Sequence, residues 1–306
     1  MSINKEYLPS NEKIRKILFP IDGSESSKAV IEWGIRNLDH SETSIYLLIV
    51  IKSLDHDYSP TVTSQILEEA KCRFKERKFL VEKTDFVVSK SVASAICQYA
   101  DTEGIAHIIM GSHGKTIGPI IFGSISRAVM EKARQPVVII KNPHLPLLET
   151  ANPNESVRTH ERSVLVPVDN NDVAEKLIPL MSELFDKHSA VIHLLHVVVH
   201  DSHNAAHINN QFESGKKILE KNKETFEAAG YWVAAAGYES GDPAEVIFKY
   251  AEKRGIDQIS ILSQHLSNIE KLLFGSISTV LVKQNKYKVL VFSCGKTKKD
   301  TRQPVH

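Results

Sequence analysis

The chain contains an internal repeat, which constrains its fold more than any other feature of the sequence. Residues 17–22 read ILFPID and residues 164–169 read VLVPVD, at an offset of 147 residues. The pentapeptide FGSIS occupies residues 122–126 and recurs unchanged at residues 274–278, at an offset of 152. Two landmarks in the same order indicate that the 306 residues hold two copies of one unit.

Each copy alternates short apolar runs with longer stretches at helical spacing. This pattern is typical of βαβ units, so we expect an α/β fold with a mostly parallel sheet in each half. Asp242-Pro243-Ala244-Glu245 has the residue order of a capped helix start. The expected strands lie near 15–21, 44–51, 85–88, 106–111 and 136–141, then near 163–168, 190–199, 232–238, 257–263 and 288–293, and the expected helices of the first half lie near 25–37, 61–83, 92–103 and 123–134.

The segment between the two copies is proline-rich and shows no hydrophobic periodicity, which indicates a linker. We therefore predict a first domain over residues 1–142, a linker over 143–161 and a second domain over 162–294. The polar, basic residues 295–306 are expected to form a disordered tail.

Composition excludes several classes of function. The chain carries 38 Lys and Arg against 37 Asp and Glu, whereas a general nucleic-acid binder needs a clear basic excess. Its three cysteines form no C-x-x-C pair, so neither a disulfide framework nor a cysteine zinc site is expected. The polar amino terminus and the absence of a long apolar run predict a cytoplasmic protein without a membrane span.

Residues 106–127 form the most specific segment of the chain. An apolar strand runs into Gly111-x-x-Gly114, and after eight more residues the chain reaches Gly123-Ser124 at an expected helix start. Glycines allow the backbone to approach a ligand closely, and a helix start presents free N–H groups to a phosphate. Ser124 and Ser126 add hydroxyl donors, and Lys115 and His113 add positive charge.

Asp22 follows the first strand and could accept hydrogen bonds from a ribose, since parallel sheets bind ligands at the carboxyl ends of their strands. The alternative is a structural role for these residues. In that interpretation the glycines are turn residues, Ser124 caps its own helix, and Asp22 caps the helix expected over 25–37.

With these motifs, both halves resemble universal stress protein domains, and the whole chain resembles a tandem universal stress protein. The resemblance rests on Pro-x-Asp after the first strand and on a pattern close to G-x2-G-x9-G-(S/T). It implies five-stranded parallel sheets of order 3-2-1-4-5, like those of adenine nucleotide alpha hydrolases. It also implies that the last strands, 136–141 and 288–293, pair within the chain as an internal pseudo-dimer, which would cover two apolar edges.

In the ATP-binding branch of this family, adenine lies near the first two strands, ribose on the Asp and the phosphates over the glycine loop. The spacer from Lys115 to Phe122 has eight residues instead of nine, so the loop departs slightly from the family pattern. The resemblance implies nucleotide contacts from Pro20, Ile21, Asp22, Val50, Met110, Gly111, His113, Gly114, Gly123, Ser124, Ile125 and Ser126.

The second half departs further from the pattern. Ser263 aligns with Gly111 and Leu266 with Gly114, although Asp169, Gly275 and Ser276 are retained. A leucine side chain would obstruct the approach of the backbone to a phosphate. We therefore expect the first half to bind nucleotide and the second to be a degenerate partner.

Histidines are concentrated between residues 188 and 207, in the second half. His200, His203 and His207 could supply imidazole ligands to a zinc ion, a hypothesis that the spacing supports only weakly. His193 and His196 are three residues apart on an expected strand, so their side chains should face opposite sides of the sheet.

These observations predict a cytoplasmic stress-response protein that binds ATP or another adenine nucleotide, with Mg²⁺ arriving on the phosphates, and acts as a sensor or adaptor for an unidentified protein partner. Further self-association as a homodimer stays open. Two other functions also stay open. One is an enzyme of the nucleotide alpha hydrolase type, with ATPase or pyrophosphatase activity, suggested by Pro20-Ile21-Asp22-Gly23-Ser24. The other is a structural interaction module without nucleotide.

Overall fold

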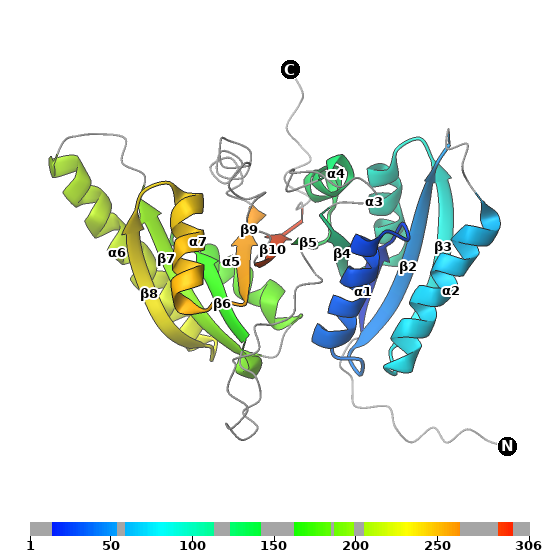
Figure 1. The fold of residues 1–306 in the computed structure, drawn as a ribbon, viewed down its shortest axis with the longest axis horizontal. Helices are drawn as coiled ribbons and strands as arrows, with labels where there is room; N and C mark the ends of the chain where they lie inside the picture. The colour runs from blue at the N-terminus through cyan, green and yellow to red at the C-terminus, as the bar shows by residue number, and fades with distance from the viewer. Residues whose placement is uncertain are drawn as a thin grey trace.

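A computed structural model describes residues 14–53, 59–112, 123–141, 162–184, 187–198, 205–263 and 287–295. The two halves lie side by side, and in each half helices flank its strands (Figure 1). In chain order the first half contains β1 (Arg15–Pro20), α1 (Glu25–Asn37), β2 (Thr43–Lys52), α2 (Pro60–Glu76), β3 (Leu80–Ser89), α3 (Val92–Glu103), β4 (His107–Gly111), α4 (Ser124–Lys132) and β5 (Val137–Lys141). The second half contains β6 (Arg162–Pro167), α5 (Val173–Ser182), a 3-10 turn η1 (Lys187–Ser189), β7 (Ala190–Val198), α6 (Ala205–Ala228), β8 (Trp232–Ser240), α7 (Pro243–Arg254), β9 (Gln258–Leu262) and β10 (Lys288–Ser293).

The strands form one ten-stranded sheet of order β3-β2-β1-β4-β5-β10-β9-β6-β7-β8. Each half is parallel and has the order 3-2-1-4-5, which confirms the fold expected from the sequence. At the centre, β5 and β10 pair antiparallel, with Ile140 opposite Leu290 and Val138 opposite Phe292. The two apolar edges therefore cover each other, and the halves pair within the chain as predicted. We call this β5–β10 junction the seam.

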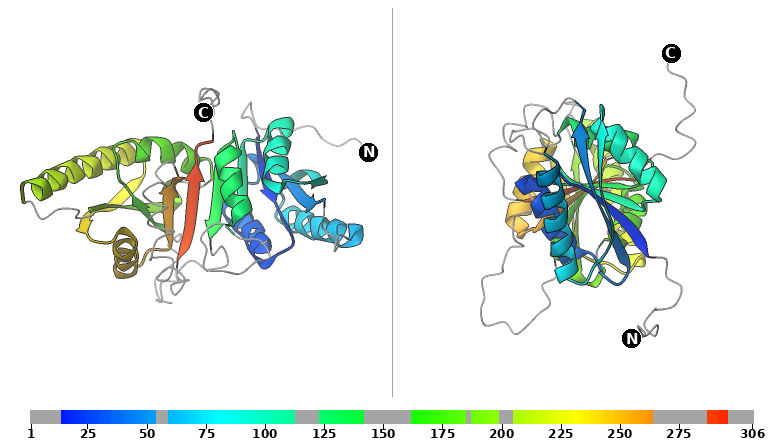
Figure 2. Two further views of the ribbon diagram at one scale, coloured as in Figure 1. Left: turned by 90° about the horizontal axis from the view of Figure 1, so that it is seen from above. Right: turned by 90° about the vertical axis from the view of Figure 1, so that its right-hand side faces the viewer.

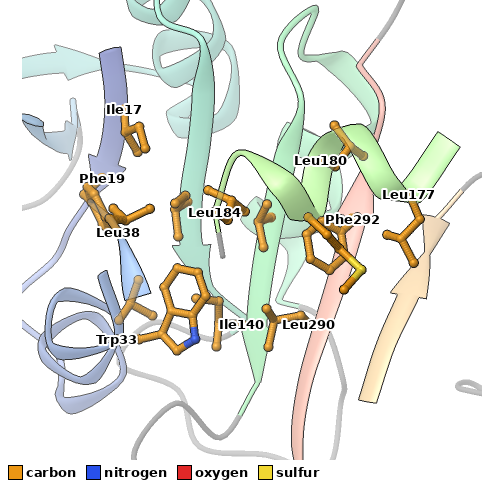
Figure 3. Close-up of a cluster of buried hydrophobic side chains, with 14 of the residues drawn as sticks. Ile17, Phe19, Trp33, Leu38, Ile140, Leu177, Leu180, Leu184, Leu290 and Phe292 are labelled. Carbon is orange, nitrogen blue, oxygen red and sulfur yellow. The ribbon is translucent and has the colours of Figure 1, made fainter. Parts of the chain in front are cut away.

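Helices cover both faces of this twisted sheet (Figure 2). The buried residues of α1, α2, α5 and α6 belong to one core cluster, and those of α3, α4 and α7 to the cluster on the other face. The first cluster runs across the seam without interruption, because Trp33 of α1 and Leu177 of α5 pack over the central strands that carry Ile140, Leu290 and Phe292 (Figure 3).

Polar contacts also connect the halves. His107, which is 3% exposed, begins β4, and its Nε2 lies 2.7 Å from Oε2 of Glu183 at the end of α5. The Arg15 guanidinium donates a hydrogen bond of 2.7 Å to the backbone carbonyl of the same Glu183. Arg15 also forms an ion pair with Glu42. We call Arg15, His107 and Glu183 the paired site.

One expected helix ends earlier than predicted, and the following strand begins earlier. The pattern over 61–83 predicted a helix, but α2 ends at Glu76 and β3 already begins at Leu80. Lys78 has a φ of 65°, and its N–H donates to Lys75 O while Phe79 N–H donates to Phe74 O. This is a Schellman motif, which normally has glycine at the left-handed position.

Other expectations concern local details. Glu245 N–H donates to Asp242 Oδ1 at 3.1 Å, so Asp242 caps α7 as predicted. His193 contacts Tyr250 of α7, which belongs to one core cluster. His196 contacts Tyr238, which packs against the other core cluster on the α6 side. The two histidine rings therefore face opposite sides of the sheet. The proposed linker and the tail beyond Gly295 lie outside the described residues, and the domain boundaries stay a prediction.

Candidate functional site

The candidate site lies where the connections out of β1 and β4 diverge. These strands pair in parallel, with Leu18 opposite Ile108, so their carboxyl ends lie together. From β1 the chain continues to α1 on one face of the sheet, and α4 follows β4 on the other face. At a divergence of this kind, α/β proteins bind their ligands in a crevice outside the strand ends. We call the corresponding place in this protein the crevice.

The β1 side of the crevice is built by Asp22 and Ser24. Ile21 N–H donates to Leu48 O at 2.9 Å, which extends the β1–β2 pairing to Ile21, the residue before Asp22. Asp22 Oδ1 accepts hydrogen bonds from the backbone N–H of Ser24 at 3.0 Å and from its hydroxyl at 2.6 Å. Ser24 itself caps α1, since its Oγ accepts from Ser27 N–H. The half-buried Asp22 therefore keeps Oδ2 for another donor.

The turn after Asp22 has a backbone conformation that favours glycine. Gly23 has a φ of 76°, in the left-handed region that favours glycine. A Cβ there would lie 2.6 Å from Cδ1 of Ile66 on α2, the end of a side chain that would have to shift to admit it. The turn leads directly into α1, which begins at Glu25.

The β4 side of the crevice is the base of the glycine loop. Ser112 N–H donates to Ile140 O at 3.1 Å, and Gly123 N–H donates to Ser112 O at 2.6 Å. The buried Ser126 hydroxyl donates to the carbonyls of Ser112 and Gly123, at 3.0 Å each. These bonds join the two ends of the loop, so Gly123 lies close to Ser112 and its neighbour Gly111, as the motif suggested.

The start of α4 has no side-chain cap. Gly123 is the N-cap residue and provides no side chain to accept a hydrogen bond from the first turn. Ser124 is the first helical residue and not the cap, and Ser124 and Ile125 are both exposed. The N–H groups of the first turn, with the positive end of the helix dipole, therefore suit an anionic ligand.

The other predicted residues divide into those placed near the crevice and those outside the described ranges. Pro20 ends β1, Met110 is buried just before Gly111, and Val50 lies near the end of β2. His113, Gly114 and Lys115 lie outside the described residues.

In the second half, the helix start that corresponds to α1 is occupied by a protein side chain. Asn222 of α6 is fully buried, and its Oδ1 accepts from Ala174 N–H at 2.7 Å while its Nδ2 donates to Asn170 O at 2.7 Å. Asp169 is exposed and accepts from the amide of Asn170. Sequence reasoning missed Asn222, because a residue distant along the chain that caps a helix leaves no local motif.

The histidine hypothesis concerns residues of which little is described. His200 and His203 lie outside the described residues, as do Leu266, Gly275 and Ser276, and the side chain of His207 is not described. Within the described ranges, no group of three or more His, Cys, Asp or Glu side chains is arranged to hold a metal ion. Among the same residues, no helix combines the length and apolar character that a membrane crossing requires.

Comparison with known protein families finds the same match in each copy of the internal repeat. The model of the universal stress protein family matches residues 13–141 and, a second time, residues 161–293. The chain belongs to the universal stress protein family. Its two family matches correspond to the two halves of the sheet.

Relatives with one copy and with two copies are both found. Universal stress protein MJ0577 of Methanocaldococcus jannaschii is 27% identical over 153 residues, covering 42% of this chain and 94% of its own. Universal stress protein YxiE of Bacillus subtilis is 28% identical over 130 residues, covering 38% and 87%. The crystal structure of a universal stress protein from Archaeoglobus fulgidus covers 94% of this chain and 99% of its own, with a TM-score of 0.57 and 19% identity, and shows the same fold.

Proposed function

We propose that this universal stress protein binds one adenine nucleotide, ATP in the first instance, in the crevice of its first half. The observation that carries the proposal is the Gly123 N–H to Ser112 O bond, which closes the loop base at the start of α4, where the helix has no side-chain cap. Phosphates would lie over α4, and Asp22 Oδ2 would accept from the ribose. Family membership supports this arrangement.

The proposed contacts are those that the family resemblance suggested, with one change of role. The Ser126 hydroxyl is buried and donates to two backbone carbonyls, so we assign it to the shape of the loop base and not to a phosphate. Ser124 and Ile125 are exposed at the helix start and are the more accessible contacts. Mg²⁺ would accompany the nucleotide, because phosphate oxygens are its usual partners in such complexes.

The second half is proposed to bind no nucleotide. Asn222 already satisfies the start of α5. In the sequence, Leu266 aligns with Gly114 of the first half. We infer a sensor or adaptor in which occupancy of the first half changes the surface around α4 that a protein partner meets.

Isothermal titration calorimetry with ATP and Mg²⁺ tests the site. We expect one nucleotide per chain, and we expect Asp22→Asn to weaken binding about tenfold or more, since a hydrogen bond to a charged acceptor contributes about 1.5–3 kcal/mol. Asp169→Asn is the matched control, because Asp169 occupies the equivalent position of the second half, and it should leave the affinity unchanged.

Two results would reject this assignment. One is two equivalent ATP sites per chain, and the other is equal affinity in wild type and Asp22→Asn. Chromatography of nucleotides after incubation with the protein tests the enzyme alternative separately. Multiple turnover to AMP and pyrophosphate, or to ADP and phosphate, would favour the enzyme alternative over a binding protein.

A further inference from the structure

The internal repeat places two equivalent polar sites beside the seam, and their charges differ. The offset of 147 residues that aligns Ile17 with Val164 also aligns Arg15 with Arg162 and Arg36 with Glu183. His107 lies opposite Ile17 in the first half as Gln258 lies opposite Val164 in the second. The equivalent of the paired site therefore consists of Arg162, Gln258 and, from the other half, Arg36.

In the paired site, a carboxylate from α5 of one half meets the sheet of the other. Glu183 contacts both His107 and Arg15 across the seam. By the same alignment, the residue that corresponds to Glu183 is Arg36, an exposed residue in the last turn of α1. One side of the seam thus has an acidic partner for its basic residues, whereas the other has an additional cation.

A lysine adds to this excess of positive charge. Lys288 begins β10 and lies in register with Gln258 of β9. Its equivalent in the first half is Pro136, because the next residue of each strand has an equivalent partner: Val289 pairs with Ile259, and Val137 pairs with Ile108. Lys288 is only 7% exposed, and no hydrogen bond or ion pair of its ammonium is found among the described residues. We call Arg36, Arg162 and Lys288 the seam cluster.

Among the described residues, Asp257 is the carboxylate whose charge acts on Lys288. Asp257 precedes β9, and its Oδ2 already accepts the backbone N–H of Ser163 at 2.9 Å. Gln258 is fully buried and its Nε2 donates to Ser260, while its Oε1 is buried without a hydrogen bond from any residue that the structure describes. Buried charges are normally paired because their desolvation is costly.

We propose that the seam cluster binds a small oxyanion, a phosphate or a carboxylate, which bridges Lys288 and Arg162 of the second half and Arg36 of the first. The ligand would supply the negative oxygens that Glu183 supplies at the paired site. Phosphate and carboxylate oxygens are the acceptors that guanidinium and ammonium groups bind best. The site is distinct from the nucleotide crevice, and binding would connect the two halves.

The protonation of Lys288 gives a second readout. Burial, followed by the like charges of Arg162 and Arg36, lowers the pKa of Lys288 to about 8, and Asp257 opposes this shift. Only the ammonium form attracts an anion. Binding should therefore weaken as the pH rises through about 8, and a bound anion should raise the pKa of Lys288.

Thermal unfolding of the full chain, titrated with phosphate or acetate against chloride at constant ionic strength, tests the site. We expect a saturable rise in Tm with at least one of the two oxyanions. The oxyanion that raises the Tm at the lower concentration identifies the ligand class. Lys288→Met keeps an unbranched side chain, and Arg36→Glu introduces the carboxylate found at the paired site. Each should weaken the oxyanion response about tenfold or more, and Arg36→Glu should raise the Tm in chloride.

Arg77→Glu makes the same charge change at the exposed end of α2 and should retain the full oxyanion response. Asp22→Asn should also retain it, which separates this site from the nucleotide crevice. The proposal is wrong if wild type shows no saturable response. It is equally wrong if Lys288→Met and Arg36→Glu respond as wild type does, or if Asp22→Asn alone abolishes the response.

Discussion

Small polar side chains determine the shape of the crevice. Ser24 caps α1 and donates its hydroxyl to Asp22, while the Ser126 hydroxyl holds the two ends of the glycine loop. Because these serines satisfy the local backbone, Asp22 Oδ2 and the first turn of α4 stay available. Ser24 and Ser126 thus shape the proposed site, whereas Asp22 and the first turn of α4 are proposed to contact the ligand.

Another single residue, Glu183, makes a pH-dependent contribution to stability. Its hydrogen bond with His107, and then the charges of His107 and Arg15, lower the pKa of Glu183 below its usual 4.5. A carboxyl whose pKa is lowered by folding stabilises the protein above the unfolded value, and this contribution is lost as the pH falls through the folded value.

We therefore expect wild type to lose more stability than Glu183→Gln on acidification below about 4.5. The Glu183 side chain is 42% exposed, so the difference should stay below about 1 kcal/mol. Urea denaturation at a series of pH values measures it, with Glu220→Gln on the exposed face of α6 as the charge-matched control. Parallel stability curves for wild type and Glu183→Gln would contradict the assigned role of the carboxylate.

Among the elements, α2 shows how a helix can end without the usual residue. Lys78 adopts the left-handed conformation at the position where glycine is normal, and Phe74 and Phe79 contact each other across the turn with ring centroids 5.5 Å apart. This aromatic contact holds the Schellman motif together and offsets the backbone strain at Lys78.

Lys78→Gly should stabilise the protein by up to about 1 kcal/mol, because relief of the left-handed strain exceeds the added freedom of the unfolded chain. Lys75→Gly, three residues earlier and inside the helix, should instead destabilise it by about 1 kcal/mol. The free energies of unfolding in urea give both values. Destabilisation by both substitutions would show that Lys78 carries little strain.

This helix end also shows where prediction from the sequence stops. The repeat, the parallel sheets, the strand order and the β5–β10 pairing follow from hydrophobic patterns and from the family resemblance, and they are confirmed. The end of α2 does not follow from them, because Lys78 is chemically a good helix residue. Asn222 capping α5 and Glu183 reaching His107 are likewise invisible beforehand, since each joins positions far apart in the chain.

For the whole molecule, the continuous core across the seam implies that the two halves unfold together. The first core cluster includes Trp33 and Phe19 from one half and Leu177 and Phe226 from the other. A defect in the second half should therefore be detected by a probe in the first.

Leu177→Ala, at a fully buried position of α5, should cost about 2–5 kcal/mol. The chain has two tryptophans, and Trp232 is 61% exposed, so a Trp232→Phe background leaves Trp33 as a reporter of the first half. We expect Leu177→Ala to lower the denaturation midpoint of Trp33 fluorescence as much as that of far-ultraviolet circular dichroism. An unchanged Trp33 midpoint would mean that the halves unfold independently.

The antiparallel β5–β10 pair joins two halves that one continuous chain encodes separately. In an assembly of identical subunits, every substitution at the junction appears twice, so a charge reversal that suits one side is imposed on the other. Here Arg36 and Glu183 occupy equivalent positions with opposite charge. Covalent fusion thus permits the two sides of the junction to specialise independently while their shared backbone pairing stays the same.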